Sequence, residues 1–233
     1  MLAAQPIPAS VLVDQRGHGL SRPPPLPPDW WDLGHDLVQV LDAMAPEPPR
    51  VGVGHSSGAT ALVMSELLRP GTFDRLVLVE PIIYPEATFS VDDMVAAALR
   101  RKSRFTSPDE ARSRFRGRGP FARWTDAALD AYVTHGLRRD GDGWVLRCAP
   151  EIEAAFYRGG GSHGVWNRLG EIACPVVIVA GEESTSHPSD FALTQASRFQ
   201  RADLRLVPDA GHLVPMERPD AVAAIVGGVL DEV

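Results

Sequence analysis

Ser56 has the surroundings that point most directly to chemistry. It lies in Gly54-His55-Ser56-Ser57-Gly58, after two valines that alternate with glycines from Val51 and before an apolar-periodic run from Ala59 to Leu68. A buried strand followed at once by a helix needs a very tight turn, and glycines beside the serine leave room for strained backbone. The amino end of a helix also favours developing negative charge. The pattern predicts a nucleophilic serine; a glycine-rich turn without catalysis is the alternative.

A serine is a poor nucleophile at neutral pH unless a neighbouring base takes its proton. Histidine suits this role because its ordinary pKa is nearest the working pH. Of the seven histidines, His212 follows the last expected strand, in Ala210-Gly211-His212, and we expect it to be the base. His55 flanks Ser56 and is expected to line the substrate pocket. The other histidines are in glycine-rich loops (His18, His163) or without nearby chemical context (His35, His135, His187).

Three motifs occur in a fixed order along the chain: Asp14-Gln15-Arg16-Gly17-His18-Gly19-Leu20-Ser21, the Gly-x-Ser-x-Gly pentad around Ser56, and Ala210-Gly211-His212-Leu213-Val214-Pro215. Together they resemble the α/β-hydrolase superfamily, with the first motif matching its D-x-R-G-x-G-x-S loop. The resemblance implies an acyl-transferring serine hydrolase with a Ser-His-acid triad and a helical cap after the sixth strand. It also implies that the backbone N–H of Ser57 contacts the oxyanion.

The acidic member of the triad departs from the family's common pattern. That pattern has an aspartate three residues beyond the glycine that ends the seventh strand, and Ser184 stands there, after Gly181. A serine cannot supply the negative charge that stabilises an imidazolium. Some family members carry the acid at the end of the sixth strand, where this chain has Glu80. Because strand ends are held rigidly, Glu80 is favoured; Glu183, which flanks Ser184, and Asp190 remain open alternatives.

Hydrophobic periodicity predicts an α/β fold with a mostly parallel sheet and flanking helices. Expected strands are Ser10–Val13, Val51–Val53, Leu76–Val79, Pro175–Gly181 and Leu204–Val207, and expected helices outside the cap are Asp32–Met44, Ala59–Leu68 and Asp220–Leu230. Between them lie the expected helices Asp92–Arg101, Pro108–Phe115 and Asp126–His135, and a tight turn at Asp140–Gly143. The expected domains are a first core part at 1–83, a helical cap insertion at 84–169 and a second core part at 170–233.

The resemblance also leads us to expect an N-terminally shortened version of the fold. The family sheet has three strands before the loop that matches Asp14–Ser21, whereas nine residues precede Ser10 here. The third of those strands would lie beside the nucleophile strand and would carry a second oxyanion donor. A chain without it would expose an open strand edge.

Amino-acid composition limits the kinds of partner that we expect the protein to bind and the cellular compartment in which we expect it. The 233 residues carry a formal charge of -7, which gives no support to nucleic-acid binding. Two cysteines without metal-ligand spacing fit a reducing cytoplasm, and no apolar run is long enough for a membrane span. We expect a small-molecule substrate, no cofactor and no metal. The expected function is hydrolysis of a small ester, or of a related acyl or C–C bond; the alternative is a non-catalytic or impaired α/β-hydrolase-like binding protein with an incomplete oxyanion hole.

Overall fold

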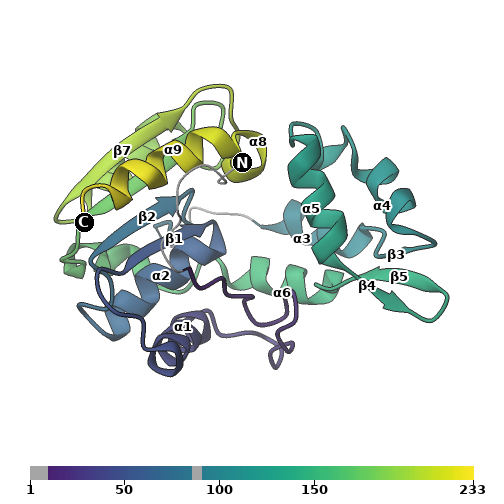
Figure 1. Ribbon diagram of the computed structural model, residues 1–233, viewed down its shortest axis with the longest axis horizontal. Coiled ribbons are helices and arrows are strands. Elements are labelled where there is room, and N and C mark those ends of the chain that lie inside the picture. The colour runs from purple at the N-terminus through teal and green to yellow at the C-terminus, as the bar shows by residue number, and fades with distance from the viewer. Residues whose placement is uncertain (1–9, 86–90) are drawn as a thin grey trace. The chain divides into compact units, whose positions relative to one another are not determined.

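The computed structural model describes residues 10–85 and 91–233 (Figure 1). Within these residues the chain forms two compact units. The first unit comprises residues 10–13, 29–85 and 160–233, and the second comprises 14–28 and 91–159. The two units are groups of residues that contact one another and are not a test of the domain boundaries. The boundaries expected at 83/84 and 169/170 stay a prediction.

A four-stranded parallel sheet forms the centre of the first unit. Its strands are β1 (Val51–His55), β2 (Arg75–Val79), β6 (Val176–Gly181) and β7 (Ala202–Val207), in the order β1-β2-β6-β7. Each neighbouring pair is parallel, with Gly52 opposite Leu76 and Leu78 opposite Ile178. The near-continuous apolar runs of β2 and β6 are buried, as expected for strands covered on both faces. The expected parallel sheet is confirmed for these four strands.

Helices cover both faces of this sheet. The first unit contains α1 (Trp31–Met44), α2 (Ser57–Leu68), η2 (Val165–Glu171), α7 (Ser189–Ser197), α8 (Val214–Glu217) and α9 (Pro219–Leu230). Figure 1 shows α9 on one side of the sheet and α1 and α2 on the other. Val77, Val79 and Val179 pack with residues of α8 and α9 in one buried cluster. The helix α2 is buried from Ala59 to Leu67, which fixes its amino end against the sheet.

The expected strand at Ser10–Val13 is wrong. This segment has no regular secondary structure, and no described strand pairs with it. Leu12 is 93% exposed, and Val11 and Val13 are also exposed. A short apolar run holds a strand conformation only when a neighbouring strand satisfies its backbone and its side chains are buried. This segment has neither support.

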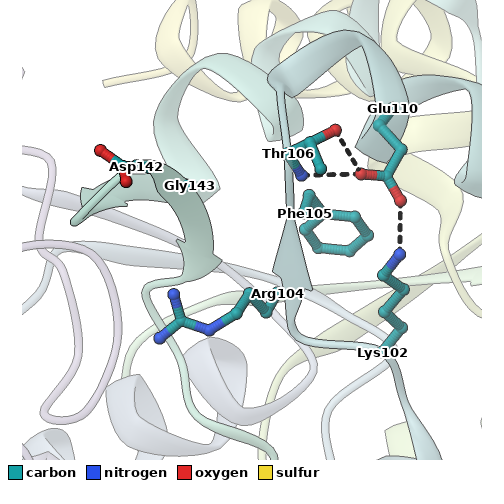
Figure 2. Close-up of a pocket in the computed structure, with 7 residues that line it drawn as sticks. All are labelled: Lys102, Arg104, Phe105, Thr106, Glu110, Asp142 and Gly143. Carbon is teal, nitrogen blue, oxygen red and sulfur yellow. Dashed lines mark hydrogen bonds and ion pairs between the residues drawn. The ribbon is translucent and has the colours of Figure 1, made fainter.

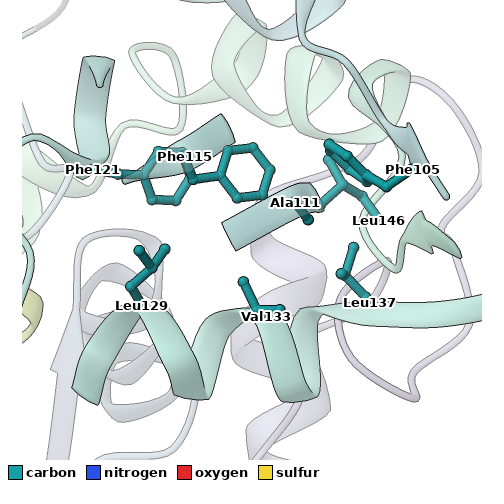
Figure 3. Packing of buried hydrophobic residues seen from close by; sticks show 8 residues of the cluster. All are labelled: Phe105, Ala111, Phe115, Phe121, Leu129, Val133, Leu137 and Leu146. Carbon is teal, nitrogen blue, oxygen red and sulfur yellow. The ribbon is translucent and has the colours of Figure 1, made fainter. Parts of the chain in front are cut away.

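The second unit is mostly helical and has its own core. Its elements are α3 (Asp92–Arg100), β3 (Arg104–Phe105), α4 (Pro108–Phe115), η1 (Gly119–Phe121), α5 (Asp126–Gly136), β4 (Leu137–Asp140), β5 (Gly143–Leu146) and α6 (Pro150–Gly159). The core gathers buried side chains of α4, η1, α5 and the short strands (Figure 3). Phe115 lies 4.6 Å from Phe121 and 5.4 Å from Phe105 between ring centroids.

The three helices expected in this region are confirmed within one residue at each end. The sequence did not predict the antiparallel sheet β3-β5-β4. Asp140 pairs with Gly143, so the expected tight turn is confirmed as the loop of a β-hairpin. In the part of the chain that the structure describes, no helix is long and apolar enough to cross a lipid bilayer.

The Asp14–Ser21 loop is also part of the second unit, and its motif has a structural reason. The Asp14 carboxylate accepts the Leu20 N–H at 2.9 Å, and the Ser21 hydroxyl donates to the Asp14 carbonyl at 2.7 Å. Gly19 has a φ of 51°, and a Cβ there would lie 2.1 Å from the Asp14 carboxyl carbon. The glycine therefore lets the loop close on its own aspartate.

Candidate active site

Ser56 lies in the tight turn between β1 and α2, in a backbone conformation that few residues adopt. Its φ is 54° and its ψ is -121°. The Ser56 N–H donates to the Val79 carbonyl at 2.9 Å, which ties the turn to the end of β2. At Gly54, a Cβ would lie 2.6 Å from backbone atoms of Gly58 and Ala59, so only glycine allows α2 to begin this close to β1. Such strain persists only where the surrounding structure imposes it, and it is concentrated at functional sites.

His212 lies in the loop that follows β7, and its Nε2 is 3.2 Å from Ser56 Oγ. The loop is held by its own motif, because Glu217 accepts the Gly211 N–H at 2.9 Å. Gly181 allows the loop to approach β6, since a Cβ there would lie 2.2 Å from the Ala210 carbonyl oxygen. Two residues that the sequence separates by 156 positions are therefore brought within hydrogen-bond distance.

Glu80 follows β2 directly and is fully buried. Its Oε2 lies 2.9 Å from His212 Nδ1, and its Oε1 accepts the Gly181 N–H at 2.9 Å. Its φ of 49° turns the chain out of the strand. The next three carbonyls, of Pro81, Ile82 and Ile83, then accept hydrogen bonds from side chains instead of from a neighbouring strand. Those donors hold the turn that presents the Glu80 carboxylate to His212.

The two other carboxylates considered for this position, Glu183 and Asp190, have exposed side chains. Asp190 accepts the N–H of its neighbour Phe191 at the start of α7. Ser184, which occupies the family's common acid position, donates its hydroxyl to Glu80 Oε2 at 2.7 Å. The structure thus brings Glu80, and not Glu183 or Asp190, against His212.

The electrostatics of the site favour an ionised Glu80 beside a neutral His55. Burial raises the pKa of Glu80, but hydrogen bonds with His187 and His212 outweigh burial and hold that pKa well below its usual range. Burial, assisted by the nearby His212, lowers the pKa of His55 to about 4. The neutral His55 ring donates from Nε2 to the His212 carbonyl at 2.9 Å. His55 therefore supports the histidine loop, and its expected place in the substrate pocket stays a prediction.

Ser57, expected to supply an oxyanion contact, is the first residue of α2. Its backbone N–H belongs to the first turn of the helix, at the positive end of the helix dipole. Among the described residues, Glu80, His187 and His212 bring three possible metal-ligand atoms within 4.8 Å of one another. Both histidine nitrogens lie within hydrogen-bond distance of Glu80 Oε2.

The sequence interpretation placed Ser184 at the common acid position but missed its contact with Glu80, and it assigned no role to Ser186 or His187. Ser186 Oγ lies 3.1 Å from both Glu80 Oε2 and His212 Nδ1. The expectation that His187 lacks chemical context is wrong, because its Nδ1 lies 2.8 Å from Glu80 Oε2. The sequence held one signal for these contacts. A serine at the family's common acid position can hydrogen-bond a carboxylate that another segment of the chain supplies.

The second unit contains a pocket of about 520 Å³ between α4 and the short strands (Figure 2). Two charged side chains of its lining form ion pairs nearby: Lys102 with Glu110, and Arg104 with Asp140. Glu110 also accepts the Thr106 N–H and hydroxyl at 2.7 and 2.8 Å. Its lining contains no serine, cysteine or histidine. The Ser56 site is the candidate for chemistry.

Comparison with known proteins points in the same direction. A profile of the alpha/beta hydrolase family matches residues 2–225. The abhydrolase domain-containing protein ACTT2-1 of Alternaria alternata is 24% identical over 223 residues, covering 80% of this chain and 84% of the relative. The esterase YbfF of Escherichia coli is 24% identical over 225 residues, covering 95% and 82%.

Among solved structures, the peroxisomal alpha-beta-hydrolase Lpx1 of Saccharomyces cerevisiae is similar, with a TM-score of 0.79 and 20% identity. The match covers 94% of this chain, which spans 65% of the length of Lpx1. At this identity the likeness concerns the fold: a mostly parallel sheet flanked by helices.

Proposed function

Because the chain belongs to the α/β-hydrolase family, we propose that it is a serine hydrolase that cleaves a small-molecule ester, or a related acyl or C–C bond. The family match supports hydrolysis in general. The ester is proposed because a serine-histidine pair is suited to acyl transfer, and because a relative of similar length is an esterase.

In the proposed mechanism, Ser56 Oγ attacks the ester carbonyl carbon while His212 Nε2 takes the hydroxyl proton. The resulting oxyanion is stabilised by the Ser57 N–H at the amino end of α2. When the tetrahedral intermediate collapses, the C–O bond to the alcohol breaks and His212 returns the proton to the leaving oxygen. Ser56 then carries the acyl group.

Deacylation repeats these steps with water as the nucleophile. His212 Nε2 takes a proton from water, the oxygen adds to the acyl carbon, and the proton goes back to Ser56 Oγ as the acid departs. Glu80 keeps the Nδ1 proton of His212 in place in both halves and stabilises the transient imidazolium. It does not itself take up the proton.

One observation carries this proposal: the line of contacts from Ser56 Oγ to His212 Nε2 at 3.2 Å and from His212 Nδ1 to Glu80 Oε2 at 2.9 Å. A nucleophile, a base and an orienting carboxylate within hydrogen-bond reach are the geometric requirement for an activated serine. The strained φ of Ser56 and the burial of Glu80 support it further.

The test is hydrolysis of p-nitrophenyl acetate and butyrate by the wild-type chain and by Ser56→Ala. We expect the substitution to lower kcat by several orders of magnitude, as loss of a serine nucleophile does. Ser57→Ala is the matched control, because it removes a neighbouring hydroxyl and keeps the backbone N–H. Activity of Ser56→Ala within about tenfold of wild type would contradict the proposal. Saturable binding of esters without any turnover by the wild type would favour the binding-protein alternative.

A further inference from the structure

His187 is a second buried imidazole on the Glu80 carboxylate. Its side chain is fully buried, and its Nδ1 lies 2.8 Å from Glu80 Oε2. Its Nε2 lies 2.9 Å from the Pro81 carbonyl oxygen. The His187 backbone N–H donates to Ser184 Oγ at 3.0 Å, which fixes the residue at the start of the segment that leads to α7. Glu80 Oε2 is therefore flanked by two histidines, His187 and His212.

The proton positions follow from the partners. A carbonyl oxygen only accepts, so His187 Nε2 must carry a hydrogen that points to Pro81. An ionised carboxylate also only accepts, so Nδ1 at 2.8 Å needs a hydrogen as well. Ser184 donates its hydroxyl to Glu80 Oε2, and the Ser186 hydroxyl lies within reach of both Glu80 Oε2, at 3.1 Å, and His187 Nδ1, at 3.2 Å. Even with a hydrogen bond from Ser186, a neutral His187 with its hydrogen on Nε2 would keep the Nδ1 lone pair 2.8 Å from a buried carboxylate oxygen.

We propose that His187 is an imidazolium that shares the Glu80 carboxylate with His212 and acts as a positioning residue for the catalytic site. The opposite charge beside Glu80 allows a carboxylate to stay ionised at full burial, where an unpaired charge is very costly. The hydrogen bond from His187 also fixes the carboxylate that orients His212. His187 acts through Glu80 and does not touch Ser56.

The positive charge on His187 also opposes a second one on His212. The two rings are stacked with centroids 6.1 Å apart. The other titratable groups near His187 are neutral: burial raises the pKa of Tyr84, whose ring lies 5.4 Å away, and burial lowers the pKa of His55 to about 4. The charge balance is thus set by Glu80, His187 and His212. Removing the His187 charge makes protonation of His212 easier, and a protonated His212 cannot act as a base.

Two neutral variants separate charge from hydrogen bonding. Asparagine can imitate the Nδ1 donor to Glu80, whereas glutamine can imitate the Nε2 donor to Pro81. If charge is what matters, both His187→Asn and His187→Gln move the acid limb of the kcat/KM profile for p-nitrophenyl butyrate upward by about one pH unit. His135→Gln is the control, since it replaces an exposed histidine of α5 that lies in the second unit. Unshifted acid limbs in both variants would overturn the proposal.

The kinetic arm rests on the proposed hydrolase function, so a second readout is independent of turnover. In the full chain labelled with ¹⁵N-histidine, His187 should show two protonated ring nitrogens at pH 7, and one N–H signal should disappear in Glu80→Gln. Through-space contacts with Tyr84 and Phe191, whose rings lie 5.4 Å from His187, assign the signals without a His187 variant. A neutral Nε2–H ring between pH 5 and 8 would overturn the proposal even if the protein is an active esterase. An imidazolium in a protein without esterase activity would uphold the charge pair and refute the proposed function.

Discussion

At the scale of single residues, the proposed role of the Glu80 carboxylate is to orient His212. Glu80→Gln removes the charge that orients His212 and keeps the shape of the side chain. We expect kcat for p-nitrophenyl esters to fall by roughly 10⁴-fold, the typical cost of losing the orienting acid of a triad. Steady-state kinetics, with circular dichroism to verify folding, measure this. Glu183→Gln is the matched control, because it changes an exposed carboxylate close in sequence to Ser184 and should leave kcat nearly unchanged. A larger fall in kcat for Glu183→Gln than for Glu80→Gln would show that the orienting acid lies in the segment after β6.

His55 gives a residue-scale prediction for stability. Its pKa is about 4 in the folded chain, against an ordinary 6.5. As the pH falls from 7, His55 is protonated in the unfolded chain before it is protonated in the folded chain. The free energy of unfolding therefore decreases between about pH 6.5 and 4. Below about pH 4, His55 is protonated in both states and contributes no further change. The loss is on the order of 3 kcal/mol. Urea unfolding at several pH values measures how the free energy of unfolding depends on pH. This pH dependence should be weaker in His55→Gln and unchanged in His135→Gln, which alters an exposed histidine. Equal slopes in His55→Gln and wild type would contradict this.

At the scale of elements, the close approach of β1 and α2 is the critical packing. A Cβ at Gly54 would meet backbone atoms of Gly58 and Ala59, which cannot move without displacing Ser56. We expect Gly54→Ala to lower kcat/KM about 100-fold, because displacement of reacting groups by about 1 Å has that cost. Gly227→Ala, in the interior of α9 with open space at its Cβ, is the control. It should stabilise the chain by roughly 0.5–1 kcal/mol and leave kcat/KM unchanged. An active Gly54→Ala enzyme would show that the turn is not constrained as described.

The elements also show why some features were predictable from sequence and others were not. Ser56, His212 and Glu80 each follow a strand that the sequence predicted, and parallel strands bring their carboxyl ends to one edge of the sheet. Ser10–Val13 looked like such a strand, but none of the described strands pairs with it, and four residues alone do not determine which strand will lie beside them. His187 and Ser186 lie in an irregular segment whose course depends on contacts with residues 80–83, so neither periodicity nor spacing could place them.

At the scale of the whole molecule, the two units have separate cores and should respond separately to damage. Phe115 packs against Phe105, Phe121 and Tyr132 within the second unit. Phe115→Ala should destabilise that unit by about 3–5 kcal/mol through the cavity it leaves. Hydrogen exchange should then show lost protection in α4, α5 and β4–β5, with protection retained in β1, β2, β6 and β7. Uniform loss across all of these elements would show a single cooperative unit instead.

The central claim is that Ser56 is an activated nucleophile, and covalent labelling with a fluorophosphonate tests it most directly. The reagent reacts with activated serines independently of which ester the protein cleaves. In the folded wild-type chain, mass spectrometry after digestion should locate one adduct on Ser56. The adduct should form much more slowly in His212→Ala and in Glu80→Gln, and not at all in heat-unfolded protein. A folded wild-type chain that remains unlabelled at Ser56 would contradict the account.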